Sequence, residues 1–229
     1  MKRKLNGEVI DELYAGEQQD IFVLSVLGSE NKGTFIDIGC CYYGNTNGHL
    51  VRSNTALLEK YGWSGIGIDL QNFSEKFKQD RPNTNFIQAD ALKVDYKEIF
   101  EQNNLSNPID YLSLDLDGSG LAYSCLESII NSGYEFKVAT IEHDAYRGMQ
   151  HTDTEPQREL MRKHGYILVR QCDIIEDFWI NPKYVSKEQY EKFLYHVTLD
   201  QFGLSEDNMD THFWKQCSDM GYDFTKLYK

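Results

Sequence analysis

Long apolar runs, prolines and repeated segments are what this sequence has least of. No stretch approaches the roughly 20 apolar residues that a membrane-spanning helix needs, so we expect no membrane span. The basic residues within Met1–Glu8 are not followed by an apolar segment, so a secretory signal peptide is not expected. Only four prolines are present and no solenoid-like repeat, so the sequence predicts no Pro-rich linker.

Positive charge and paired cysteines are also scarce. The 229 residues include 23 Lys and Arg against 36 Asp and Glu, a formal charge of −13. Because nucleic-acid backbones are bound by clustered Lys and Arg, this charge argues against a nucleic-acid partner, although it allows a small local basic site. The five cysteines are an odd number without metal-ligand spacing, so we expect reduced thiols, no zinc site and a cytoplasmic protein.

What the sequence does contain is an alternation of short apolar runs and amphipathic stretches. Hydrophobic residues make up 41% of the chain, enough for one full core. The apolar runs predict strands at 34–39, 65–70, 85–90, 109–115 and 136–142. Helices are expected between them, at 52–61, 74–79, 96–102 and 121–132. Strands that alternate with helices indicate an α/β fold with a mostly parallel, doubly wound sheet.

The flanking segments extend this pattern at both ends. Residues 18–27 predict a helix that covers one face of the sheet, and residues 155–164 predict a later helix ended by Gly165. Two short runs, 166–169 and 177–180, predict an antiparallel hairpin at one sheet edge. Ser186 and Gln189 form a capping-box pattern. We therefore expect one domain over residues 1–182, with a helix and irregular tail at 183–229 packed on it.

Acidic residues close four of the predicted strands, where ligands bind in doubly wound sheets. The first strand ends in Asp37-Ile38-Gly39, and its following loop contains Gly44, so backbone N–H groups can approach a ligand closely. Asp69 ends the second strand and can accept both hydroxyls of a ribose. Asp90 ends the third and can accept a hydrogen bond from an adenine amino group. Asp115, soon followed by Asp117, ends the fourth.

Four acidic strand ends repel phosphate and suit a nucleoside that carries positive charge. S-adenosylmethionine has this chemistry, since it combines adenosine with an ammonium and a sulfonium group. A dinucleotide site needs a G-x-G-x-x-G turn, and the sequence after Gly39 does not fit it. An Asp at one strand end is commonly only a turn residue, so the prediction depends on the four together.

Several longer motifs resemble FkbM-type class I methyltransferases, from about Tyr14 to about Pro182. The most specific are QDIFVL at 19–24, GTFIDIG at 33–39, SNTALLEKYGWSGIGID at 53–69, DYLSLDLDGS at 110–119, IEHD at 141–144 and EDFWINP at 176–182. The chain departs from the family in a longer loop at 40–49, in Asp117 where Glu is common, and in Asp144 where Asn is common. The resemblance implies a Rossmann-like class I methyltransferase fold and S-adenosylmethionine-dependent O-methylation.

The expected donor-binding residues lie at and just after the strand ends: Asp37, Gly39, Gly44, Asn54, Asp69, Leu70, Asp90, Ala91 and Asp115. For catalysis, His143 is the preferred general base because its ordinary pKa is near neutrality. Asp117 or Glu142 could orient it or act as the base instead. An alternative is that Asp117, Glu142, His143 and Asp144 hold magnesium or manganese, but rim carboxylates are more commonly structural, so no metal ligand is assigned.

The sequence therefore predicts an O-methyltransferase that modifies a hydroxyl of a sugar, glycan or natural product, a small-molecule or glycan acceptor. One alternative is a non-catalytic S-adenosylmethionine-binding or scaffold protein, because fold does not settle function. Another is a protein methyltransferase, but no added recognition domain is visible in the sequence.

Overall fold

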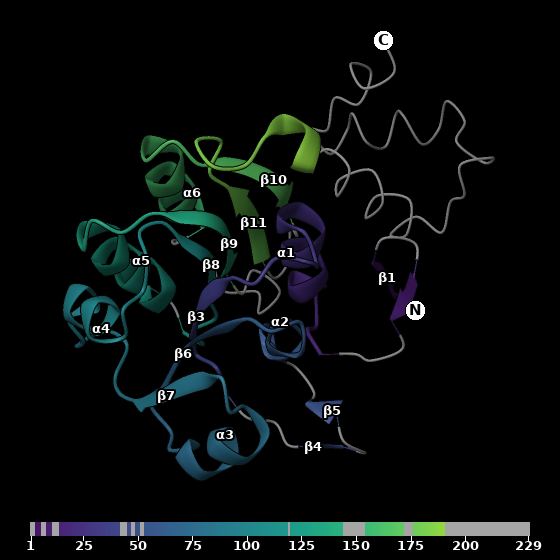
Figure 1. The fold of residues 1–229 in the computed structure, drawn as a ribbon. Coiled ribbons are helices and arrows are strands. Elements are labelled where there is room, and N and C mark those ends of the chain that lie inside the picture. Colours follow the sequence, from purple (N-terminus) through teal and green to yellow (C-terminus); the bar gives the residue numbers. More distant parts are fainter. Residues whose placement is uncertain are drawn as a thin grey trace.

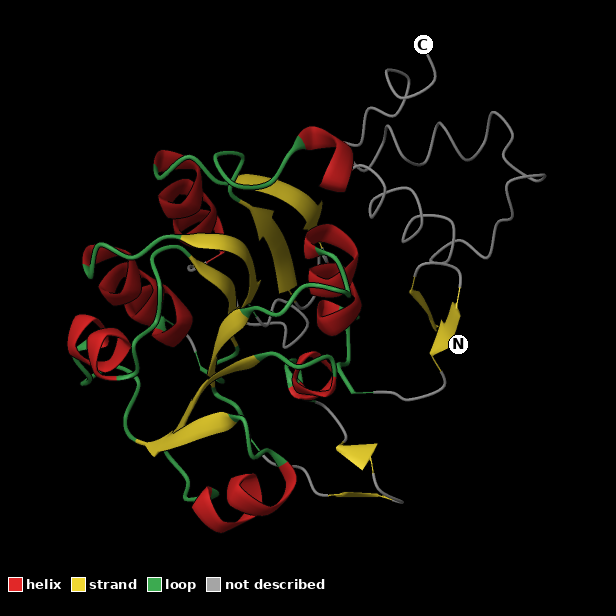
Figure 2. Ribbon diagram, viewed as in Figure 1, coloured by secondary structure: helices red, strands yellow, loops and turns green. Residues whose placement is uncertain are grey.

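A computed structural model describes residues 3–5, 8–10, 14–41, 45–46, 49–50, 53–118, 120–143, 154–171 and 176–190. These residues form helices on both sides of a central sheet (Figures 1 and 2). No helix in this part of the chain is long and apolar enough to cross a membrane.

The central sheet has seven strands in the order β10-β11-β9-β8-β3-β6-β7. Their bounds are β3 Thr34–Ile38, β6 Ser64–Asp69, β7 Thr84–Gln88, β8 Ile109–Leu114, β9 Phe136–Glu142, β10 Ile167–Gln171 and β11 Glu176–Ile180. Neighbours from β7 to β9 are parallel, whereas β11 is antiparallel to both β9 and β10. The predicted fold class is confirmed, including the antiparallel hairpin at one edge of a mostly parallel, doubly wound sheet.

Each face of the sheet has its own hydrophobic core, because successive side chains of a strand point to opposite faces. In β3, Phe35 belongs to one core, and Ile36 and Ile38 belong to the other. All three side chains are buried. This two-sided burial explains why β3 is predicted from a nearly continuous apolar run instead of an alternating pattern.

Helices of the described residues lie on both faces of the sheet (Figure 1). The first set is α1 Gln19–Leu27, α2 Ala56–Lys60 and α3 Ser74–Asp80, and the second is α4 Tyr96–Gln102, α5 Leu121–Asn131 and α6 Thr154–Lys163. Side chains of α1 and α2 join Phe35 in one core, whereas α4, α5 and α6 contribute to the core of Ile36. Phe77 of α3 packs on the Arg81 guanidinium, which also faces Phe35, so α3 lies on the α1 side.

Two short antiparallel hairpins lie outside the main sheet. They are formed by β1 Arg3–Leu5 with β2 Glu8–Ile10, and by β4 Asn45–Thr46 with β5 His49–Leu50. The predicted helix at 52–61 is shorter than expected, because α2 begins at Ala56. The Ser53 hydroxyl accepts the Ala56 N–H, and the Thr55 hydroxyl bonds a neighbouring strand, so both residues stay outside the helix.

The described end of the chain packs against α1. Ser186 donates its N–H to the Gln189 side chain, half of the expected capping box, and Gln189 donates to the Val26 carbonyl. Tyr190 packs against the α1 core. The remainder of the predicted tail, 191–229, lies outside the described residues.

Candidate functional site

A cavity of about 850 Å³ opens at the carboxyl ends of the parallel strands, the expected ligand position in this fold. It collects residues from the ends of β3, β6 and β8, from the turn after β7, and from the approach to α1. The sequence-predicted residues that line it are Gly39, Asn54, Asp69, Leu70, Asp90, Ala91, Asp115, Asp117 and Glu142. Gly44 and Asp144 lie outside the described residues.

Gly39 brings two strands into close contact at the floor of the cavity. Its φ is +77°, and a Cβ placed there would lie 1.7 Å from the Asp115 carbonyl oxygen. Its N–H donates to the Ile68 carbonyl at 2.9 Å. Only glycine fits this left-handed position, so the end of β3 turns sharply and leaves room above the sheet for a ligand.

Asp69 and Asp90 lie at the cavity and also stabilise their own turns. Asp69 Oδ1 accepts the Gln71 N–H at 2.8 Å, and partial burial raises the pKa of Asp69. Asp90 accepts the Leu92 N–H at 3.0 Å and pairs with exposed Lys93 at 2.6 Å, contacts that lower the pKa of Asp90. Both carboxylates are therefore held in place while they line the cavity.

Asp37 lies beneath the cavity instead of lining it. The residue is 3% exposed, and the Thr55 hydroxyl donates to its Oδ2 at 2.6 Å. Burial raises the pKa of Asp37, although the bond from Thr55 and the charge of Arg81 oppose the shift. Asn54, beside Thr55, does line the cavity and donates to the Ser113 hydroxyl at 3.0 Å.

Glu142 has neighbours at the cavity that were not predicted from the sequence. In the β9–β11 register it lies opposite Glu176, so the two side chains share a face of the sheet. Burial and the neighbouring Asp115 carboxylate raise the pKa of Glu176 to about 8, and Gln19 donates a hydrogen bond to it. Glu17 and Gln19 also line the cavity, so the approach to α1 closes this side.

His143 is not among the residues that line the cavity. It follows Glu142 directly, so its side chain points toward the opposite face of the sheet. There it is fully buried, with its Nε2 3.7 Å from Asp177 Oδ1. Asp177 in turn accepts two hydrogen bonds from Arg158 of α6, at 2.6 and 2.9 Å.

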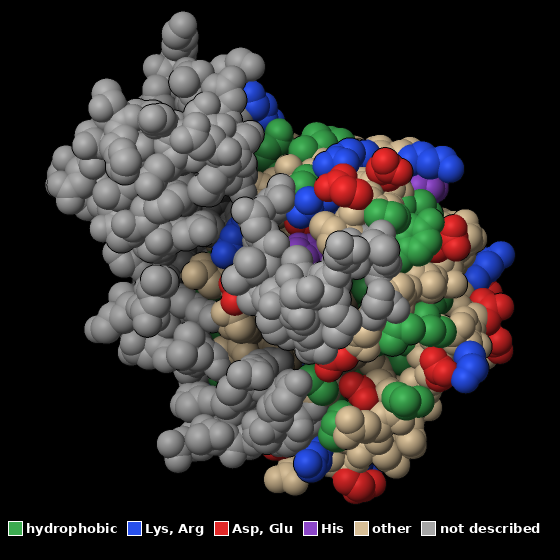
Figure 3. Space-filling view, turned by 180° about the vertical axis from the view of Figure 1, so that it is seen from behind, with side chains coloured by type: hydrophobic (Ala, Val, Ile, Leu, Met, Phe, Trp, Pro, Cys, Tyr) green, Lys and Arg blue, Asp and Glu red, His purple; other side chains and the backbone are tan. Residues whose placement is uncertain are grey.

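The cavity is strongly acidic where the structure describes it. Six carboxylate side chains line it, those of Glu17, Asp69, Asp90, Asp115, Asp117 and Glu142, and no described lining residue is Lys, Arg or His. On the face shown in Figure 3, Lys and Arg side chains are scattered among Asp and Glu. Leu70 and Leu92 add apolar surface, and they are 70% and 41% exposed.

The described residues do not form a ligand set for the alternative metal site. Among the residues placed by the structure, no group of three or more His, Cys, Asp or Glu side chains could hold a metal ion. Glu142 and His143 lie on opposite faces of the sheet, so these two members of the proposed ligand set do not point toward one another.

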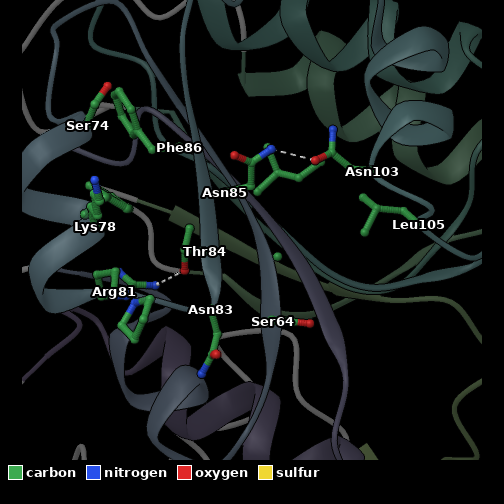
Figure 4. A pocket seen from close by; sticks show the side chains of 14 residues that line it. Ser64, Ser74, Lys78, Arg81, Asn83, Thr84, Asn85, Phe86, Asn103 and Leu105 are labelled. Atoms are coloured by element: carbon green, nitrogen blue, oxygen red, sulfur yellow. Dashed lines mark hydrogen bonds between the residues drawn. The ribbon is translucent and has the colours of Figure 1, made fainter.

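A second cavity, of about 660 Å³, lies at the other end of the sheet (Figure 4). Ser64 and Thr84 begin β6 and β7 and line it, together with Arg81 and Lys78 from the α3 side. None of the sequence-predicted site residues lines this second cavity.

Comparisons with known proteins find similar structures but no family assignment. No protein-family model matches the sequence, and no curated protein matches it. The TDP-rhamnose 3'-O-methyltransferase CalS11 of calicheamicin biosynthesis is similar at 15% identity over 71% of this chain and 76% of that chain, with a TM-score of 0.47. A Burkholderia thailandensis 1,6-didemethyltoxoflavin-N1-methyltransferase has 12% identity over 70% and 74%, TM-score 0.41. Methanococcus jannaschii fibrillarin has 13% over 79% and 81%, TM-score 0.43.

Proposed function

We propose that the protein is an S-adenosylmethionine-dependent O-methyltransferase of the FkbM type, acting on a hydroxyl of a sugar, glycan or natural product. The observation that carries the proposal is the convergence of Gly39, Asp69, Asp90 and Asp115 on one cavity whose described lining has no cationic side chain. Such a cavity repels phosphates and favours a nucleoside with positive charge. Two motifs that resemble the FkbM family, 53–69 and 110–119, supply residues to this cavity.

The donor fits the cavity with its adenosine toward β6 and β7. Asp69 is positioned to accept the ribose hydroxyls, and Asp90 to accept a hydrogen bond from the adenine amino group. Leu70 and Leu92 offer the adenine ring apolar surface that is otherwise exposed to water. The methionine part then lies over Gly39, with its positive groups toward Asp115.

For the transfer itself, Glu142 is the preferred base, with Asp117 as the alternative that also lines the cavity. The acceptor oxygen forms a bond to the methyl carbon as the carbon–sulfur bond breaks, and the bonding pair returns to sulfur. The acceptor proton passes to a carboxylate. Alignment of the two reactants supplies about 7–11 kcal/mol of barrier reduction, and general-base assistance about 10²–10⁴-fold in rate.

The position of His143 on the opposite face favours Glu142 over the base first predicted from the sequence. Replacing Glu142 with Gln should lower kcat by about 10²–10⁴-fold and leave S-adenosylhomocysteine affinity nearly unchanged. His143→Asn is the matched comparison, since it changes the adjacent residue. Isothermal titration calorimetry measures binding, and methyl transfer to a panel of sugar and natural-product hydroxyls measures turnover.

Two results would contradict these assignments. Absence of S-adenosylhomocysteine binding to the wild-type protein would reject the proposed function as a whole. Full activity of Glu142→Gln, together with loss of turnover but intact binding in His143→Asn, would return the base role to His143. Donor binding without transfer to any hydroxyl would favour the non-catalytic binding protein.

A further inference from the structure

Arg81 is a buried charged residue that the proposed reaction does not use directly. It follows α3, is 3% exposed and lies outside the donor cavity. Its guanidinium faces the rings of Phe35 and Phe77, at 6.0 and 5.4 Å from their centroids. These two rings, one on the sheet and one on α3, fix the plane in which the guanidinium N–H groups point.

Within that plane Arg81 donates hydrogen bonds to four side chains. Its Nε donates to Glu59 Oε2 at 2.7 Å, which is also a buried ion pair. Its Nη1 donates to the Ser53 hydroxyl at 3.0 Å, and its Nη2 to the hydroxyls of Thr55 at 2.8 Å and Thr84 at 3.2 Å. Figure 4 shows the bond to Thr84 from the side of the second cavity.

These bonds determine the direction of the next hydrogen bond toward the donor site. A guanidinium can only donate, so the Thr55 hydroxyl must accept from Arg81. The single proton of that hydroxyl is then available for Asp37 Oδ2, 2.6 Å away. Arg81, Thr55 and Asp37 therefore form a directed chain that ends at the carboxylate beneath the cavity floor.

Arg81 also holds the backbone on both sides of a donor-cavity residue. Asn54 lies between Ser53 and Thr55, whose hydroxyls both accept from the same guanidinium. The Asn54 side chain lines the cavity and donates to Ser113 of β8 at 3.0 Å. The segment 53–55 is thus clamped by Arg81 at one side and by the strands β3 and β8 at the other.

From this arrangement we propose that Arg81 is a positioning residue for methyl-donor binding: it clamps Ser53 and Thr55 so that Asn54 is presented to the donor. The inference deepens the proposed function and rests on it. Arg81 acts through other residues and does not contact the donor. Its loss should therefore weaken donor binding while turnover at saturating donor is largely retained.

The charge of Arg81 supports the same role. Burial and the nearby Asp115 carboxylate raise the pKa of Asp37, whereas the Thr55 hydrogen bond and the Arg81 charge lower it. Ser113, Cys40 and Tyr111 also lie near Asp37. Without Arg81, less opposes protonation of Asp37, so on lowering the pH Asp37 should lose its negative charge at a higher pH than in the wild type. Affinity for the donor should begin to fall at that higher pH.

The first test makes the same substitution, Thr to Val, at each of two threonines that accept a hydrogen bond from Arg81. Thr55→Val removes the hydroxyl that connects Arg81 to Asp37, whereas Thr84→Val removes a buried hydroxyl that also accepts from Arg81 but does not reach Asp37. We expect Thr55→Val to raise the dissociation constant for S-adenosylhomocysteine, and the KM for the donor, about tenfold. Thr84→Val should change both by no more than about twofold.

The second test changes Arg81 itself. Arg81→Lys keeps a positive charge near Glu59 but cannot donate to both Ser53 and Thr55 in the geometry of a fork. We expect about a tenfold rise in the donor KM, with kcat changed by less than about threefold. The double variant Arg81→Met with Glu59→Gln avoids an unpaired buried charge and should behave similarly. If the Arg81 variants do not fold, the comparison of the two threonines decides the question.

The outcomes separate the two proposals. If the wild-type protein binds no S-adenosylhomocysteine, the proposed function and this inference both fail. If the wild type binds it but Thr55→Val and Thr84→Val change the dissociation constant equally, the network has only a structural role and the positioning inference is overturned. A loss of kcat without a change in donor KM in Arg81→Lys would overturn it as well.

Discussion

Single side chains differ in whether sequence position alone predicts that they line the cavity. Asp69 and Asp90 are predictable because Asp69 ends β6 and Asp90 follows β7, and parallel strands end at the same edge of a sheet. Glu142 and His143 are harder to separate, because one step along β9 exchanges the two faces of the sheet. Sequence indicates the segment that reaches the rim, but the register with β11 determines which side chain faces the cavity.

At the same scale, Gly39 gives a prediction about stability. Gly39→Ala places a methyl group against the Asp115 carbonyl and forces alanine into a left-handed conformation, so it should lower the free energy of unfolding by about 3 kcal/mol or more. Gly133 is the matched control, since its φ is +83° but a Cβ there meets nothing within 4 Å. Gly133→Ala should cost only about 1 kcal/mol. Chemical denaturation of both variants checks the difference, and equal losses would show that the Asp115 contact is unimportant.

Among the elements, α1 supplies a side of the cavity that the sequence did not predict, and β11 supports it through the bond between Gln19 and Glu176. The predicted helix at 18–27 agrees with α1 to within a residue, and it was expected only to cover the sheet. Its approach residues Glu17 and Gln19 nevertheless line the cavity. The available signal was Gln19-Asp20 directly before a run of apolar residues, since both polar side chains are buried at the helix start. Glu176, which accepts a hydrogen bond from Gln19, is 157 residues away in sequence, so spacing could not connect the two.

Glu176 of β11, the partner of Gln19, also makes stability depend on pH. Its pKa is raised from 4.5 to about 8 in the folded protein, so the folded state retains a proton that the unfolded chain has lost. The free energy of unfolding should therefore fall as pH rises from 4.5 to about 8, by an amount on the order of a few kcal/mol. Glu176→Gln should remove much of this slope and be more stable than the wild type near pH 8. Denaturation across this range measures the slope, and Glu159→Gln, a change at an exposed residue of α6, is the control.

An unchanged slope in Glu176→Gln would contradict the assignment of this pH dependence to β11. A slope that disappears equally in Glu159→Gln would show instead that the general negative charge of the protein causes the effect.

The molecule as a whole is acidic, and its architecture was the most predictable part. The order of apolar runs gave the parallel strands and the edge hairpin, because burial on both faces leaves a strong local pattern. The hydrogen-bond networks that connect α2, α3 and β3 were not predictable. Arg81 and Thr55 resemble ordinary surface residues in sequence, and only tertiary packing buries them.

The formal charge of −13 and the carboxylate-lined cavity give a prediction for ionic strength. S-adenosylmethionine carries a sulfonium charge that S-adenosylhomocysteine lacks, and salt screens its attraction to the carboxylates. Raising the salt concentration from about 0.05 M to about 0.5 M should weaken S-adenosylmethionine binding more than S-adenosylhomocysteine binding, by a factor on the order of three. Calorimetric titrations of both ligands measure the two salt slopes. Equal slopes would contradict a cavity that attracts the donor by its charge.

The position of β11 has a consequence for how the chain folds during translation. β10 is made before β11, yet among the strands that the structure describes β10 pairs with β11 alone, and β11 pairs with β9. A nascent chain on the ribosome therefore holds β10 without its described partner strand until β11 has emerged. Gln19, synthesised 157 residues before Glu176, also lacks the carboxylate that it bonds until β11 has been made. Ribosomal pausing between these strands would prolong a state in which the parallel strands are paired but Gln19, at the cavity, still lacks Glu176.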